Sequence, residues 1–180
     1  MLFEKKTQSL EIARKIIKNT GLDENLGIIQ QKKHPVAAKP REFLKLVMAL
    51  STCNLVQTMK ADFIIGDLKE GLRDEILLDY VKESLAKQDL IKLKGRAEVE
   101  EMRTAVMAVV NELQDFWKDG TDPQGSGPGP RYYCVKEVLK RIGGGPNLDL
   151  HDALFELMYL QHRHYINCFR EILKKKPEQV

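Results

Sequence analysis

The chain has 180 residues, 43% of them hydrophobic, and a formal net charge of +3. This is the size of one domain with enough apolar surface to bury a core, so the composition excludes a chain that is disordered throughout. No apolar run is long enough to span a bilayer and the first residues do not read as a secretory signal, so we expect a soluble, cytoplasmic protein. The 3 cysteines lie far apart in the sequence, which favours free thiols over a disulfide framework.

The spacing of apolar residues is helical along almost the whole chain. The first predicted helix covers residues 2–19 and stops at a Thr-Gly pair. A lysine-rich connection over residues 22–39 follows, with room for a short helix over residues 24–31. Pro40 suits the first turn of the second predicted helix, which covers about residues 41–59, because proline has no amide hydrogen to lose there.

Residues 60–71 are predicted as a connection and residues 72–87 as an amphipathic helix. Residues 88–95 alternate leucine with lysine, but a lone strand would have no partner in this sequence, so we expect a last helical turn and a loop. The clearest helix is predicted over residues 97–118, because its apolar residues recur in steps of three and four, as in helices that pack on other helices. These residues are Val99, Met102, Val106, Val109, Leu113 and Phe116.

Residues 120–130, GTDPQGSGPGP, are rich in glycine and proline, which predicts a flexible loop. Beyond it we expect a C-terminal helical hairpin over residues 131–176, with a glycine turn after Ile142 and a long helix over about residues 148–175. Two helices cannot enclose a core alone, so the hairpin must dock on the first 119 residues. The sequence therefore predicts an all-α protein: one helical domain over residues 1–176, a bundle of about six helices, with globin-like packing as one possible arrangement.

Charge is distributed unevenly along the chain. Basic residues outnumber acidic ones in the first third, and acidic residues outnumber basic ones in the middle. The two parts can pack against each other with complementary charge, or the first third can bind RNA or DNA. The residues that would contact phosphates are Lys32, Lys33, Lys39, Arg41 and Lys45. Nucleic-acid binding is therefore kept as an alternative function.

Residues 63–95 resemble part of the CRM family of RNA-binding domains. The resemblance lies in Ile65-Gly66, in Gly71-Leu72 and in the LIKLK run of residues 90–94, and it implies a glycine turn, a helix and a strand that contact RNA. The turn carries Asp67 and Glu70 where a phosphate clamp needs basic residues, and no later segment supplies partner strands. We therefore do not assign the chain to this family.

Residues 160–168, LQHRHYINC, hold two of the 4 histidines. At about 100° per residue, His162 falls in the middle of an apolar face and His164 almost opposite to it. The two rings cannot share a metal ion, because the ligands of tetrahedral zinc converge within about 2 Å of it. His162 is interpreted as a core histidine with one hydrogen bond. The alternative is a small-molecule or haem sensor with a pocket formed by His162 together with Phe155, Met158 and Phe169.

Motifs for catalysis are missing from the sequence. The glycine clusters follow helices instead of strands and contain proline, so they do not form phosphate-binding loops, and no nucleophile or metalloprotease signature is present. No metal or cofactor is predicted, and an enzyme is not favoured. The leading hypothesis is a non-enzymatic interaction or regulatory domain that binds a protein partner, or itself, through an apolar surface between helices. The candidate partner-binding residues flank the glycine-proline loop and are aromatic, as interface hot spots often are: Phe116, Trp117, Tyr132 and Tyr133.

Overall fold

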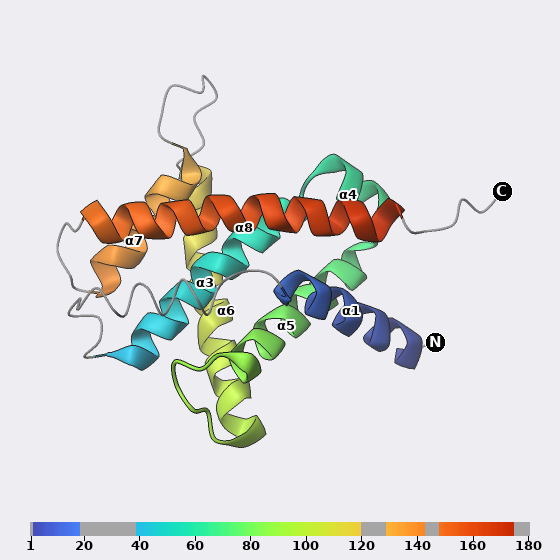
Figure 1. The fold of residues 1–180 in the computed structure, drawn as a ribbon, viewed down its shortest axis with the longest axis horizontal. Coiled ribbons are helices and arrows are strands. Elements are labelled where there is room, and N and C mark those ends of the chain that lie inside the picture. Colours follow the sequence, from blue (N-terminus) through green and yellow to red (C-terminus); the bar gives the residue numbers. More distant parts are fainter. Residues whose placement is uncertain (1, 19–38, 120–128, 143–147, 175–180) are drawn as a thin grey trace.

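The computed structural model describes the chain except for residues 1, 19–38, 120–128, 143–147 and 175–180 (Figure 1). The described residues form helices and no strands. The helices are α1 (Leu2–Ile17), α3 (Pro40–Thr58), α4 (Asp62–Asp67), α5 (Glu70–Lys87), α6 (Gly95–Asp119), α7 (Pro130–Ile142) and α8 (Leu148–Lys174). The all-α helical bundle predicted from the apolar spacing is therefore confirmed.

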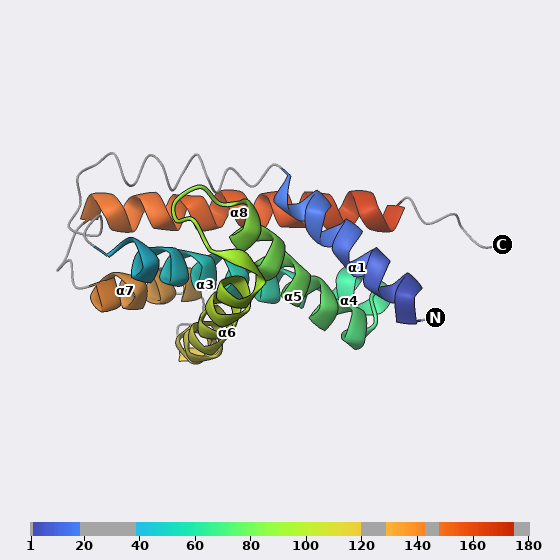
Figure 2. The same cartoon turned by 90° about the horizontal axis from the view of Figure 1, so that it is seen from below.

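Helix α3 lies at the centre of the molecule. It packs against α5, α6, α7 and α8, and Figure 2 shows it between α8 on one side and α6 and α7 on the other. Most of its residues are buried, from Phe43 near the start to Thr58 at the end. A helix that is apolar on all sides is stable only when other helices enclose it, so the run FLKLVMAL determines the position of α3 in the fold.

The other helices surround α3 and share its core. Helix α1 packs against α5 and α8, and α5 also packs against α6. Buried apolar side chains from every described helix form one hydrophobic cluster. The start of α1 and the C-terminal end of α8 lie at the same end of the molecule (Figure 1).

Helix α4 lies in a segment that the sequence predicted to be a connection. Its six residues make less than two turns, too few for apolar spacing to indicate a helix. Ile64 is fully buried, whereas Phe63 and Ile65 are 37% and 46% exposed. The single buried side chain is what anchors α4 to the core.

Three predicted helix starts were slightly wrong. Helix α5 begins at Glu70, α6 at Gly95 and α7 at Pro130, each one or two residues earlier than expected. Pro130, assigned to the loop, occupies the first position of α7, where a missing amide hydrogen has no cost. Residues 88–94 form no strand, as expected, but they also form no further helical turn: α5 ends at Lys87, and the Gln88 side chain bonds the backbone N–H and C=O of Ile91 in a loop. The predicted helix over residues 24–31 and most of the glycine-proline loop lie outside the described residues.

Two tyrosines link α5 to α8 inside the core. Tyr80 and Tyr165 are both fully buried, their hydroxyl oxygens are 2.6 Å apart, and their rings meet edge to face. Burial raises the pKa of Tyr80 to about 12 and that of Tyr165 well above its usual value. Both hydroxyls therefore stay protonated and satisfy each other as donor and acceptor.

This pair makes a double-mutant prediction. Tyr80→Phe or Tyr165→Phe leaves one buried hydroxyl without a partner, and we expect each single change to lower the free energy of unfolding by about 1–3 kcal/mol. The double variant removes both hydroxyls, so its loss should be smaller than the sum of the two single losses. Urea unfolding of the four proteins measures this. Strictly additive losses would mean that the two hydroxyls do not depend on each other.

Candidate functional site: an aromatic surface on α6, α7 and α8

Aromatic rings on α7 and α8 form a continuous ladder. His151, Phe155 and Tyr159 follow each other four residues apart on one face of α8, with ring centroids 6.2 Å and 5.5 Å apart. On α7, the Tyr132 ring lies 4.7 Å from His151 and 5.5 Å from Tyr133. We call these five residues the ring ladder.

Arg131, in the first turn of α7, connects the ring ladder to α6. Its guanidinium carbon lies 5.0 Å from the centroid of the Trp117 ring on α6 and 5.7 Å from that of Tyr159 on α8. Figure 1 shows the end of α6 and the start of α7 together at one edge of the molecule. Arginine over a ring face contributes about 0.5–2 kcal/mol, depending on how dry the contact is. The ring ladder, Trp117 and Arg131 are together called the aromatic surface.

The aromatic surface is open to solvent in part. Tyr133 is 39% exposed and Tyr159 is 53% exposed, and Leu160, next to Tyr159 in the chain, is 50% exposed. Single exposed apolar residues are ordinary on proteins, whereas neighbouring exposed apolar side chains that form one patch mark interaction sites. The chemistry of this surface is therefore apolar contact around one positive charge.

A buried amide positions Arg131. Asn54 on α3 is fully buried; its Nδ2 donates to the Met158 carbonyl of α8 at 2.7 Å, and its Oδ1 accepts from Arg131 Nε at 3.1 Å. Only this orientation of the amide satisfies both contacts, because the nitrogen donates and the oxygen accepts. One side chain of the central helix thus fixes both α8 and Arg131.

Asn54 belongs to a polar stripe on the side of α3 that faces α8. Gln161 donates to Ser51 Oγ at 2.9 Å, and the Thr58 hydroxyl lies 3.0 Å from His162 Nδ1. The Thr58 hydroxyl also donates to the Asn54 carbonyl at 2.9 Å. Since a hydroxyl has one hydrogen, we assign His162 as the donor in its contact with Thr58. The stripe sets the register between the two helices.

The pKa values of Arg131, in the aromatic surface, and of His162 nearby are both shifted. Burial lowers the pKa of Arg131. Electrostatic interaction with Tyr159, Cys134 and Cys53 raises it, but by less. Burial, and then the positive charge of Arg131, lower the pKa of His162. Arginine stays protonated in proteins, so at neutral pH the charge in this region belongs to Arg131 and the imidazole is neutral.

Three of the four aromatic residues predicted to bind a partner lie in this surface: Trp117, Tyr132 and Tyr133. Phe116 is half-buried against the hydrophobic cluster, as is Trp117, but it makes none of the ring and arginine contacts described above. Sequence reasoning missed Arg131, and it did not associate Tyr159 with this surface. The four-residue spacing of the α8 rings was visible in the sequence, but their contact with α7 depends on the folded hairpin.

The side chains expected to form a pocket with His162 have different surroundings in the structure. Phe155 belongs to the ring ladder, whereas Met158 and Phe169 are fully buried in the hydrophobic cluster. His162 makes the one hydrogen bond expected of it but is only partly buried. A sensor with a ligand at His162 therefore stays a prediction.

The predicted nucleic-acid surface is only partly described. Lys32 and Lys33 lie outside the described residues. Lys39 and Arg41 are exposed at the start of α3, while the Lys45 ammonium pairs with Glu42 at 2.7 Å. Nucleic-acid binding stays a prediction. Of its five candidate residues, the structure describes three, and one of these is paired with a carboxylate.

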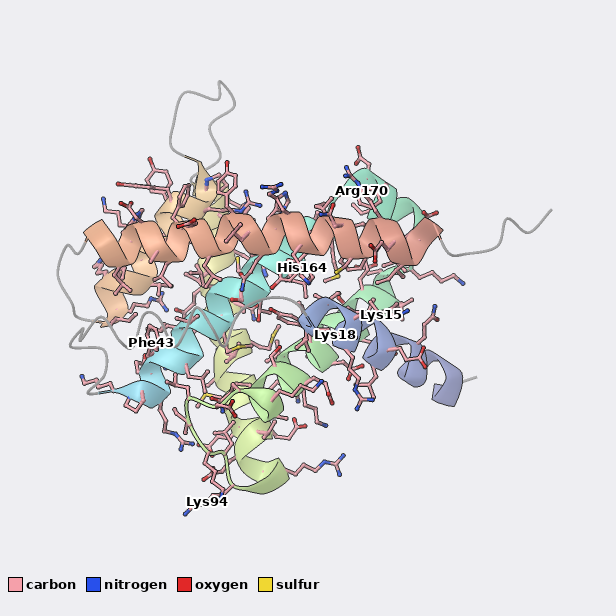
Figure 3. All side chains as sticks on the ribbon, viewed as in Figure 1. Lys15, Lys18, Phe43, Lys94, His164 and Arg170 are labelled. Carbon is pink, nitrogen blue, oxygen red and sulfur yellow. The ribbon has the colours of Figure 1, made fainter. Side chains whose placement is uncertain are left out.

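His164 and Cys168 form a second polar contact on α8, toward α1 (Figure 3). His164 Nε2 lies 2.8 Å from the Ile16 carbonyl and 3.5 Å from Cys168 Sγ. Burial, and then Glu171, raise the pKa of the Cys168 thiol, so it is a poor nucleophile at neutral pH. Within the described residues, no three histidine, cysteine or acidic side chains are placed to hold a metal ion. None of the described helices combines the length and apolar character needed to cross a membrane.

Comparison of this chain with protein-family models, with curated proteins and with solved structures finds no significant match. The globin-like arrangement therefore stays a prediction. The function has to be argued from the residues of the aromatic surface.

The shifted pKa of His162 predicts a dependence of stability on pH. Because the pKa is lower in the folded protein than in the unfolded chain, the unfolded state binds more protons as the pH falls below about 6.5. His162 therefore contributes a loss of stability as the pH falls through that value, and the loss levels off below the folded pKa. We expect His162→Gln, which does not titrate, to show a smaller fall in unfolding free energy between about pH 7.5 and pH 5.5.

Urea unfolding at several pH values measures this difference. The comparison at about pH 8, where the imidazole is neutral in both states, is the control for lost packing. Parallel pH curves for the two proteins would contradict the assignment.

Proposed function

We propose that this protein is a non-enzymatic interaction domain that binds a protein partner through the aromatic surface. The observation that carries the proposal is the ring ladder, which joins α7 to α8 and ends in two exposed tyrosines, Tyr133 and Tyr159. Aromatic residues and arginine are enriched at the energetically important centres of protein interfaces, where they supply large contact areas with few rotatable bonds.

The rigidity of the surface supports this function. Arg131 is held by the Asn54 amide and by two rings, and each ring of the ladder rests on a neighbour. Side chains that are ordered before binding lose little conformational entropy when a partner covers them. A partner would therefore gain the apolar contact without ordering this surface first.

The charge of the surface favours a different protein over a second copy. A symmetric dimer centred on this patch places its two-fold axis beside Arg131, and the Arg131 side chains of the two copies would then approach each other. Like charges in an interface cost several kcal/mol. A partner that is apolar with acidic groups avoids that cost.

The proposal is tested by capture from native extract with the purified protein as bait. Tyr159→Ser and Tyr133→Ser should each reduce the recovery of the specific partner about tenfold or more, because loss of an interface hot spot costs 2 kcal/mol or more. Leu78→Ser is the matched control, since Leu78 is 39% exposed on α5, outside the aromatic surface. Sedimentation of the purified protein reports self-association separately. Recovery that falls equally in all three variants, or in none, contradicts the proposal.

A further inference from the structure

Arg131 has no acidic partner within the described residues. Other arginines do: Arg14 pairs with Glu83, Arg103 with Glu100, and Arg141 with Glu112 and Glu137. Within the part of the chain that the structure describes, the Arg131 side chain makes one hydrogen bond, to the neutral amide of Asn54. The groups that perturb its pKa include no carboxylate.

An unpaired charge in a partly dry position is expensive to keep. Removing a charged group from water without a counter-ion destabilises the folded state, and the two rings offset only part of that cost. In contrast to the surface ion pairs, the position of Arg131 is fixed from three helices, by Asn54 on α3, Trp117 on α6 and Tyr159 on α8. Among the residues that the structure describes, this charge thus has a defined orientation and no counter-charge.

The free edge of the guanidinium is available to a ligand. Trp117 and Tyr159 lie over the guanidinium and leave its N–H groups to point outward in its plane, while Asn54 uses only Nε. The two terminal nitrogens make no hydrogen bond within the described residues and are not among their buried unpartnered atoms, so solvent reaches them. Two parallel N–H groups at this edge match the two oxygens of a carboxylate.

We propose that Arg131 binds the carboxylate of an aspartate or glutamate side chain of the partner protein in a two-pronged ion pair. This inference rests on the proposed function and specifies the partner: an acidic residue flanked by apolar residues that cover Tyr159 and Tyr133. A single charge suits a carboxylate better than a phosphate, because phosphate sites usually gather several cations and His162 beside Arg131 is neutral.

The test uses two blocked tripeptides, acetyl-Phe-Glu-Phe-amide and its glutamine counterpart acetyl-Phe-Gln-Phe-amide. The emission of Trp117, the only tryptophan, reports binding at the site. We expect the glutamate peptide to bind in the millimolar range and at least tenfold more tightly than the glutamine peptide, since hydrogen bonds between two charged groups are stronger than those to a neutral amide.

His162 gives a second readout, one that a purely structural role of Arg131 would not change. Because the charge of Arg131 lowers the pKa of His162, a carboxylate bound to Arg131 should raise that pKa toward its usual value. The ring proton of His162, followed by NMR against pH with and without saturating peptide, measures the shift. The glutamine peptide should leave the pKa of His162 unchanged.

Variants of Arg131 separate the role of its positive charge from that of the planar guanidinium group. Arg131→Gln should weaken the glutamate peptide to the level of the glutamine peptide. Arg131→Lys, which keeps the charge and is the safer variant for folding, should weaken it several-fold because an ammonium cannot form the two-pronged pair. The matched control is Arg170→Gln: Arg170 also lies over a ring, 6.0 Å from the centroid of Phe63, but near the other end of α8 (Figure 3). The Arg170→Gln variant should bind the glutamate peptide as tightly as the unchanged protein does.

Three outcomes would overturn this inference. Equal binding of the two peptides would show that Arg131 does not recognise the carboxylate, and it would leave the proposal of a protein-binding aromatic surface standing. Acetate that binds as tightly as the glutamate peptide points to a free small carboxylate instead of a partner protein. If the glutamate peptide changes neither the emission of Trp117 nor the pKa of His162, the peptide does not bind at this site. Failure of the proposed function would appear elsewhere, as capture from extract that does not depend on Tyr159.

Discussion

The enclosure of α3 is the constraint on which the rest of the structure depends. Its apolar residues place it among α5, α6, α7 and α8, and so its polar residues are also taken out of water. A buried amide without hydrogen bonds costs several times what one good bond gains. Asn54 avoids that cost only when α8 presents the Met158 carbonyl and α7 presents Arg131. The positions of both helices, and with them the aromatic surface, follow from this requirement.

Much of the fold could be predicted because apolar spacing depends on local sequence. The long runs of α6 and α8 repeat often enough to identify a helix, whereas α4 has one fully buried side chain, Ile64, and no repeat. The polar stripe of α3 is likewise visible as a spacing of three and four from Ser51 to Thr58. Which helix faces it is not visible, because that is decided by tertiary packing among several apolar faces of similar character.

The candidate site was harder to predict than the fold for the same reason. Tyr132 and Tyr133 could be selected as aromatic residues beside a loop, but the ring ladder depends on how α7 crosses α8. Arg131 carried no signal, since a lone arginine at a helix start is usually solvated. Its importance comes from three neighbours distant in sequence: Asn54, Trp117 and Tyr159. The same contact brings its charge close enough to His162 to change the ionisation of that ring.

The most direct measurement of the central claim is the coupling energy between Asn54 and Arg131. Asn54→Ala, Arg131→Met and the double variant, each unfolded in urea, give this energy as the departure from additivity, and Trp117 emission shows whether its environment changes with them. If the buried amide positions the arginine, the coupling is about 1–3 kcal/mol and Asn54→Ala alters the emission of Trp117. Losses that add to within about 0.5 kcal/mol, with unchanged emission, would contradict the account.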